Sequence, residues 1–286
     1  MICRLCPRNC GVDRAERVGY CGAPMDAVVA RAELHFWEEP YLTANGASGA
    51  VFFSGCNLKC VFCQNQKISF SIHGSQMDAK ALAEIFRRLE DEGADNIDLI
   101  TPTPYIDVIR DALEMYRPSV PIIYNCGGYE SVESIRSLEG YVDVYLPDYK
   151  YYNDALAMRY SNAPRYREIC EAALLEMRRQ VRDVVDENGV LRQGLAIRHL
   201  VLPTHAKDSF LVLDRIKALF GTDIHLSIMG QYVPCGDLTP FPEITSPLKS
   251  LEYRAVIAHA LALGFDHAFC QEDGAADREF IPKFLR

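Results

Sequence analysis

Six short, continuously apolar runs constrain the fold of this chain more than any other feature of its sequence. None of them shows the strict polar–apolar alternation of a strand with one face in water. Strands that are buried on both faces have this composition, and they are typical of parallel sheets. The runs lie at 50–55, 96–101, 121–126, 142–148, 195–203 and 224–230.

Amphipathic segments lie between these runs and predict helices. The first begins near Asp78, carries one apolar stripe at helical spacing, and ends near Gly93. Six strand-then-helix units in order predict a parallel sheet with right-handed crossovers, as either an open barrel or a doubly wound sheet. In both folds, chemistry gathers at the carboxyl ends of the strands. The other helical segments are 106–116, 132–138, 170–181 and 213–220.

The strand–helix alternation divides the chain into three parts. Residues 1–48 do not share it, and we interpret them as a cysteine-rich extension rather than a second large domain. Residues 49–240 form the α/β core. Residues 241–286 are expected to add a helix over 252–265 and one more strand near 266–271.

Charge and composition limit the classes of partner. The 286-residue chain has a formal net charge of −9. It has no strongly basic face to release phosphate counterions, which argues against a general nucleic-acid-binding protein. The sequence has no apolar signal-peptide core and no stretch long enough to span a membrane. We therefore expect a cytoplasmic protein without a membrane partner.

Eleven cysteines are unusual for a chain expected in a reducing compartment, where clustered cysteines indicate metal or redox chemistry. Three of them, Cys56, Cys60 and Cys63, directly follow the first predicted strand. Three thiolates can hold three irons of a four-iron cluster and leave the fourth iron open to a small molecule. The alternatives are a zinc site that takes a ligand from elsewhere and three unrelated thiols.

The spacing Cys-x3-Cys-x2-Cys, with the aromatic Phe62 just before the last cysteine, resembles the signature of the radical S-adenosylmethionine (SAM) superfamily. The resemblance implies a partial (β/α)6 barrel and a [4Fe-4S] cluster whose open iron is chelated by SAM. It also implies that an electron donor such as flavodoxin or ferredoxin reduces the cluster. Reductive cleavage of SAM would then give a 5'-deoxyadenosyl radical that abstracts hydrogen.

Further stretches resemble the relatives of pyruvate formate-lyase activating enzyme. Residues 145–150, "YLPDYK", carry Asp148 and Lys150 as the Asp-x-Lys pair of that branch, for which we expect a catalytic and SAM-binding role. The resemblance places Arg198 near the SAM carboxylate and Gln231 near the ribose. Independently, Arg198 interrupts an apolar strand, and a buried arginine needs an anion. A surface ion pair and a paired structural arginine are the alternatives.

Two strand ends depart from that branch. Residues 101–105, "TPTPY", offer the hydroxyls of Thr101 and Thr103 where many relatives have an acid. In "YNCGGYE", Asn125 stands where the activating enzyme has an aspartate, and Gly127 permits close approach of the backbone to a ligand. We expect all four residues to contribute to a SAM site. These elements resemble the subgroup described as pyruvate formate-lyase activating enzyme-like.

The extension holds the other cysteine cluster, Cys3, Cys6, Cys10 and Cys21. Four thiolates complete a tetrahedral site, which suits either a structural zinc or a second iron–sulfur cluster. Four reduced thiols without metal are the alternative. The four scattered cysteines are expected to be structural; they are Cys126, Cys170, Cys235 and Cys270.

Three functions remain open at this level. The first is a radical SAM enzyme that activates a glycyl radical enzyme, with a protein as substrate. The second is a radical SAM enzyme that acts on another protein side chain or on a small metabolite. The third is a zinc or iron–sulfur maturation scaffold.

Overall fold

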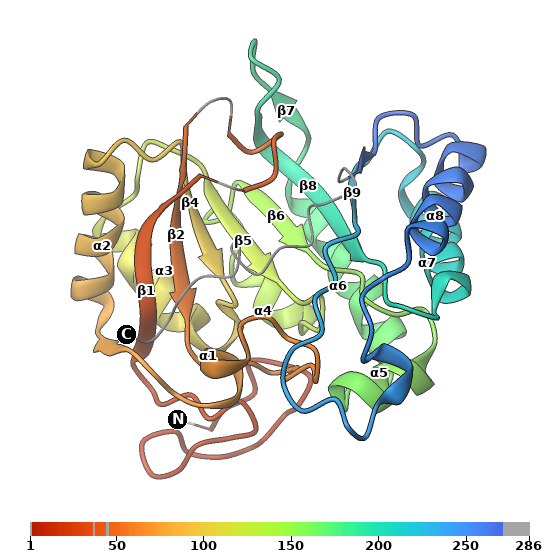
Figure 1. Cartoon of the computed structure of the whole chain (residues 1–286). Coiled ribbons are helices and arrows are strands. Elements are labelled where there is room, and N and C mark those ends of the chain that lie inside the picture. The colour runs from red at the N-terminus through yellow and green to blue at the C-terminus, as the bar shows by residue number, and fades with distance from the viewer. Residues whose placement is uncertain (1, 37, 44–45, 271–286) are drawn as a thin grey trace.

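The computed structural model describes residues 2–36, 38–43 and 46–270, and these form one ten-stranded sheet (Figure 1). In spatial order its strands are β10 (Phe269–Cys270), β9 (His225–Met229), β8 (Leu191–Leu200), β6 (Val144–Pro147), β5 (Ile122–Cys126), β4 (Asn96–Ile100), β2 (Ser48–Phe53), β1 (Ala27–His35) and β3 (Ser75–Met77). Strand β7 (Val184–Val185) pairs with β8. From β2 to β10 all neighbours are parallel, which confirms the predicted parallel sheet.

Helices connect the parallel strands and lie outside the sheet (Figure 1). They are α1 (Gln66–Phe70), α2 (Ala79–Asp91), α3 (Ile106–Met115), α4 (Val132–Arg136), α5 (Asp154–Ser161), α6 (Tyr166–Gln180), α7 (Ala206–Phe220) and α8 (Ser250–Leu263). Two 3-10 helices, η1 (Thr103–Tyr105) and η2 (Pro242–Ile244), interrupt loops. Helix α2 confirms its predicted boundaries, because the Asp78 side chain accepts a hydrogen bond from the Ala81 amide and Gly93 adopts a positive φ of 89°.

Residues 1–48 also contain a strand, β1, that was not predicted from the sequence. It runs antiparallel to β2 and extends the main sheet. The strand was missed because it combines a short buried start at Ala27–Val29 with a half-exposed remainder that holds Arg31 and Glu33. Helix α5 was also missed, since its eight residues are too short to show a clear apolar stripe. The domain boundaries themselves remain a prediction.

The inner face of the sheet is closed at the amino ends of the strands by the chain that follows β1. Tyr41 and Leu42 pack there against a buried apolar layer from β5, β6 and β8. Because β1 runs antiparallel to β2, it delivers this segment to the end of the sheet opposite the cysteine loop. The layer comprises Ile123, Val144, Leu146, Leu191 and Ala196. The carboxyl ends of the parallel strands are therefore the end at which a site can form.

The C-terminal part follows the prediction as far as the structure describes it. Helix α8 packs against α7, and β10 pairs parallel with β9. The last predicted strand residue, Gln271, lies outside the described residues. Among the residues the structure describes, no helix is both long enough and apolar enough to cross a membrane.

Candidate functional site

The three-cysteine loop begins immediately after β2, at the carboxyl end of the sheet. Gly55 turns the chain with a φ of 88°, and a Cβ at this position would lie 2.9 Å from the Cys21 carbonyl oxygen. This close approach explains the glycine and ties the loop to the N-terminal extension. Cys60 is buried, while Cys56 and Cys63 are partly buried.

The three thiols share one buried environment. Burial, followed by the charge of Cys60, raises the pKa of Cys56 to about 11. Burial, followed by Cys60 and Cys56, raises the pKa of Cys63 to about 12. Thiols that oppose one another's ionisation in this way require a nearby cation to become thiolates.

Each thiol also has a hydrogen-bonding partner. The Leu58 amide donates to Cys56 Sγ at 3.4 Å, and the Ser161 hydroxyl donates to Cys60 Sγ at 3.0 Å. Cys63 Sγ lies 3.4 Å from Ser69 Oγ. These contacts favour thiolate over thiol and fit the ligands of an iron–sulfur cluster. Within the described residues, no three His, Cys, Asp or Glu side chains are arranged around a single metal position.

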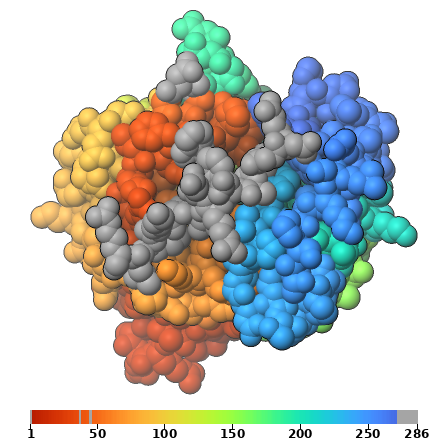
Figure 2. Space-filling model, viewed as in Figure 1, coloured from red at the N-terminus to blue at the C-terminus, as the bar shows by residue number. Residues whose placement is uncertain are grey.

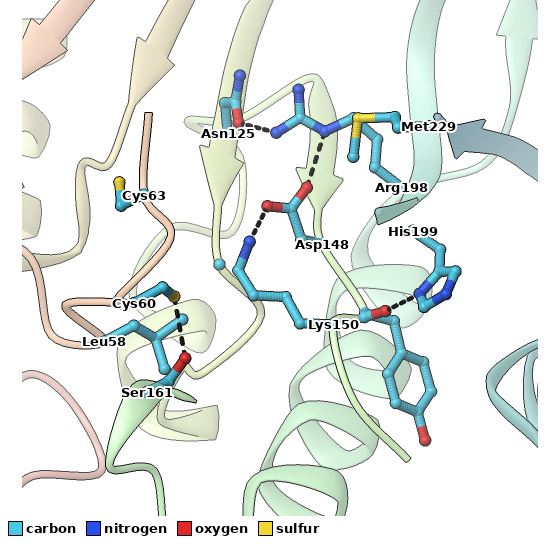
Figure 3. A network of polar contacts seen from close by, with 12 residues as sticks. Leu58, Cys60, Cys63, Asn125, Asp148, Lys150, Ser161, Arg198, His199 and Met229 are labelled. Atoms are coloured by element: carbon cyan, nitrogen blue, oxygen red, sulfur yellow. Dashed lines mark hydrogen bonds and ion pairs between the residues drawn. The ribbon is translucent and has the colours of Figure 1, made fainter. Parts of the chain in front are cut away.

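A chain of polar contacts crosses the sheet beside this loop (Figure 3). Lys150 Nζ pairs with Asp148 Oδ2 at 2.5 Å, and Asp148 Oδ1 accepts from Arg198 Nε at 2.9 Å. Arg198 Nη2 donates to Asn125 Oδ1 at 2.6 Å. Asn125 Nδ2 donates in turn to Asp98 Oδ2 at 3.1 Å. The structure therefore brings together four of the residues that the sequence placed in the site.

The register of the parallel strands explains this convergence. Asp148 forms a parallel bridge with Arg198, and Asn125 lies on β5, the parallel neighbour of β6. Burial opposes ionisation of Asp148, but Arg198 and then Lys150 hold its pKa below the usual range. Burial likewise opposes the charged form of Lys150, but the Asp148 carboxylate raises its pKa above the usual range. Both groups are therefore charged at neutral pH.

The sequence analysis missed the acidic side of this network. Asp98 is fully buried, and burial followed by the nearby Glu38 raises its pKa well above the usual range. Glu38 also lies 3.8 Å from Arg198, and both oxygens of Glu39 accept from Ser227 Oγ at 3.0 Å. The sequence did contain a signal that Asp98 belongs to the site, because a charged residue inside the apolar run "NIDLI" is as unusual as Arg198 in its strand. Glu38 and Glu39 had none.

Three of the other predicted SAM-binding residues have local packing or hydrogen-bonding partners. Phe62 is buried between the rings of Tyr160 and Tyr232. Gly127 lies against the cysteine loop, since a Cβ there would be 2.4 Å from Leu58 Cδ1. The backbone carbonyl of Gln231 accepts from Gln64 Nε2 at 3.2 Å, which holds the end of β9 against the same loop.

The two threonines after β4 make different contacts. Thr101 ends the strand with a positive φ of 60°, and its amide donates to the Asn125 carbonyl. Thr103 is buried and donates its hydroxyl to Glu130 Oε1 at 2.8 Å. Burial raises the pKa of Glu130 to about 8. His205, which follows β8, lies with its Nε2 2.7 Å from the Tyr160 hydroxyl rather than in the polar chain.

The N-terminal segment that precedes β1 forms a lobe at the lower edge of the molecule (Figure 2), and its sequence carries Cys3, Cys6, Cys10 and Cys21. Burial raises the pKa of Cys6 to about 12, with smaller effects from Cys21 and Cys10. Burial also raises the pKa of Cys21, to which Cys3 and Cys10 contribute. The thiols of this segment therefore influence one another's ionisation, and none of the four is in a disulfide.

Comparison with known proteins identifies the class. A family model described as the radical SAM superfamily matches residues 50–194, slightly more than half of the chain. The uncharacterized protein MJ0674 of Methanocaldococcus jannaschii is 30% identical over 276 residues, covering 92% of this chain and 75% of that protein. A second protein of that organism, MJ0808, is 25% identical over 282 residues, covering 87% and 75%. The chain belongs to the radical SAM superfamily.

Solved structures agree on the fold. Methylornithine synthase (PylB) superposes with a TM-score of 0.50 at 15% identity, covering 75% of this chain and 60% of that chain. Streptococcus suis SuiB gives a TM-score of 0.51 at 13% identity, covering 77% and 47%. This chain spans less than two thirds of either structure, and at these identities the likeness concerns the fold alone. The fold is thus the α/β partial barrel of radical SAM proteins with a cysteine-rich N-terminal extension, which confirms the predicted fold class.

Proposed function

We propose that the protein is a radical SAM oxidoreductase that abstracts hydrogen from a glycyl residue of a partner protein. Membership of the superfamily implies a [4Fe-4S] cluster and SAM. The observation that carries the proposal is that the loop holding Cys56, Cys60 and Cys63 lies beside the polar chain of Lys150, Asp148 and Arg198. When bound, the cluster supplies the electron that cleaves SAM and produces a hydrogen-abstracting radical.

The residues of this chain would hold the two cofactors as follows. The thiolates of Cys56, Cys60 and Cys63 would hold the cluster, and SAM would bind beside it. Lys150 extends from Asp148 toward the cysteine loop (Figure 3), and its charge acts on the Cys56 thiol. A cation at this position offsets the negative charge of the thiolates and of a carboxylate ligand. Arg198 holds Asp148 in place from the neighbouring strand.

The remaining residues of the SAM site are proposed on the family resemblance together with position. They are Phe62, Thr101, Thr103, Asn125, Gly127 and Gln231. Thr101 and Asn125 lie at neighbouring strand ends and share a backbone hydrogen bond. Thr103 is already bonded to Glu130, so its hydroxyl would support the site rather than contact SAM directly.

The glycyl substrate rests on the resemblance of "GCNLKCVFCQN" and "YLPDYK" to the activating-enzyme branch. An electron donor such as flavodoxin or ferredoxin would supply the reducing equivalent in the cytoplasm. The other candidate substrates, another side chain or a metabolite, use the same cofactor chemistry. A partner that acquires a glycyl radical signal in electron paramagnetic resonance (EPR) would distinguish them.

The N-terminal lobe is proposed as a second metal site, for zinc or a second cluster. Backbone amides two residues along the chain donate to Cys6 and Cys21, from Arg8 and Ala23. The Tyr20 amide donates to Cys10 Sγ at 3.3 Å. Amide donors of this kind stabilise thiolates, and the Cys56 thiol has the same arrangement with Leu58.

The test is anaerobic reconstitution with iron and sulfide, followed by metal analysis and an assay for 5'-deoxyadenosine under strong reductant. About four irons per chain with zinc, or about eight irons without it, would support both metal sites. A preparation that holds only zinc, or that leaves SAM uncleaved with all three thiols intact, would overturn the proposed function.

A further inference from the structure

The hydroxyl of Ser161 has an unusual partner. It donates to the sulfur of Cys60 at 3.0 Å, and both residues are buried (Figure 3). Ser161 is the last residue of α5, a helix that belongs to a different part of the chain from the cysteine loop. Nothing in the cysteine signature indicates such a contact.

A second hydroxyl, that of Tyr151, lies beside this hydrogen bond. Tyr151 Oη lies 2.7 Å from Ser161 Oγ, and Tyr151 is only 1% exposed. A serine hydroxyl has a single proton, so if it donates to sulfur it must accept from tyrosine. A sulfur without a proton can only accept. With Cys60 as a thiolate ligand, the chain therefore runs from Tyr151 through Ser161 to the sulfur.

The end of α5 is held in place by the cysteine loop and the N-terminal lobe together. The Val61 amide donates to the Tyr160 carbonyl at 2.8 Å. Arg8 donates to the Ser161 carbonyl at 3.0 Å and to the Asn162 carbonyl. These are helix-terminal carbonyls that lack partners within the helix.

Arg8 also connects this helix end to the cysteine loop. Its Nε donates to the Asn57 carbonyl at 2.7 Å, and its guanidinium stacks over the Tyr20 ring at 3.9 Å. Asn57 directly follows Cys56, so one side chain of the N-terminal lobe spans both the loop and the helix. Ser161 is thus positioned by contacts from three segments of the chain.

We propose that the chain of Tyr151 and Ser161 raises the reduction potential of the cluster bound at Cys60. One-electron reduction adds negative charge that is shared by the cysteine sulfurs. A donor hydrogen bond to such a sulfur stabilises the reduced form more than the oxidised form. Ser161 is a positioning residue in this scheme, since it acts through Cys60 and does not touch SAM. The inference rests on the proposed cluster.

The experiment is a potentiometric titration of the reconstituted full-length protein, followed by the EPR signal of the reduced cluster. In Ser161→Ala, the equilibrium constant for reduction of the cluster should fall about tenfold. This change lowers the reduction potential by about 59 mV for a one-electron couple. Tyr151→Phe should shift the potential in the same direction by less. Ser161→Thr keeps the hydroxyl and should retain the wild-type potential.

Matched controls separate this effect from general damage. Ser137→Ala and Tyr141→Phe remove hydroxyls that bond the Ser134 carbonyl and Glu114, and they should leave the potential unchanged. If Ser161→Ala loses its iron, the reduction potential of Tyr151→Phe alone tests the inference. An unchanged potential in the informative variant, at full iron content, overturns the inference. Failure of the wild-type protein to assemble a cluster would instead overturn the proposed function.

Discussion

The two cysteine groups use similar local chemistry in different surroundings. In both, a backbone amide two residues along the chain donates to a cysteine sulfur, as Leu58 does to Cys56 and Ala23 does to Cys21. The three-cysteine loop, at the carboxyl end of the sheet, provides three thiols and has the cation Lys150 nearby. The N-terminal lobe provides four. Since a cation acts on both groups, Lys150 on Cys56 and Arg14 on Cys21, the number of thiols would separate the proposed open cluster from the proposed closed site.

The largest expected effect tests this distinction directly. Cys60→Ser should remove the open cluster and lower the rate of 5'-deoxyadenosine formation by at least about a thousandfold, because the third iron loses its ligand. Cys10→Ser should remove the N-terminal metal and leave a cluster at the three-cysteine loop. Metal content and product formation measure both. Equal loss of iron and activity in the two variants would show that the groups do not form separate sites.

The next prediction concerns the charged groups of the polar chain beside the three-cysteine loop. Asp148→Asn leaves Lys150 and Arg198 buried without their shared carboxylate. Loss of one partner from a buried ion pair costs about 3–5 kcal/mol in the free energy of unfolding. Urea denaturation measures the change, with Asp107→Asn, at an exposed pair with Arg110, as the control. A loss below about 1 kcal/mol would show that the pair behaves as a surface pair.

The acidic end of the same network predicts a pH dependence. Burial, partly offset by Arg198, raises the pKa of Glu39 to about 7, so the folded protein favours its protonated form. This stabilisation is complete below the pKa of 4.5 in the unfolded chain and is lost as the pH rises through about 7. In Glu39→Gln, the free energy of unfolding should therefore fall by up to about 3 kcal/mol less than in the wild type as the pH rises over this range.

The measurement is the free energy of unfolding at several pH values between 4 and 8. The exposed Glu33→Gln, which loses only its pair with Arg31, serves as the control. Parallel curves for wild type and Glu39→Gln would show that Glu39 titrates in the folded protein as it does in water.

The smallest effect tests the link between the two regions. Arg8→Ala removes hydrogen bonds to the Asn57, Ser161 and Asn162 carbonyls, and we expect a loss of about 2 kcal/mol in unfolding free energy. The cluster potential should fall toward that of Ser161→Ala. Arg17→Ala provides the control on an exposed residue of the same lobe. A stable Arg8→Ala protein with the wild-type potential would show that the lobe and the cluster loop act independently.

Much of the fold and part of the site could be predicted. Continuous apolar runs identified six of the seven parallel strands from β2 to β10, and helical stripes identified most of the helices between them. Strand β1 escaped because its half-exposed residues mix apolar and charged types. Asp148 and Lys150 could be placed together, since residues two apart on an extended chain share a face. Their contact with Arg198 followed from two strands becoming neighbours, which required the topology as well as the pattern.

The sequence by itself determined the order of the strands and helices and the short-range spacing of the cysteines. It also marked Arg198 as a candidate site residue, because a charged side chain in an apolar strand needs a partner of opposite charge in any fold. Only the tertiary structure decided that Ser161 meets Cys60, 101 positions away, and that Arg8 reaches both the loop and α5. Hydrogen bonds act over about 3 Å, so the packing of distant segments determines which groups become partners. Such partners show no periodic pattern in the sequence.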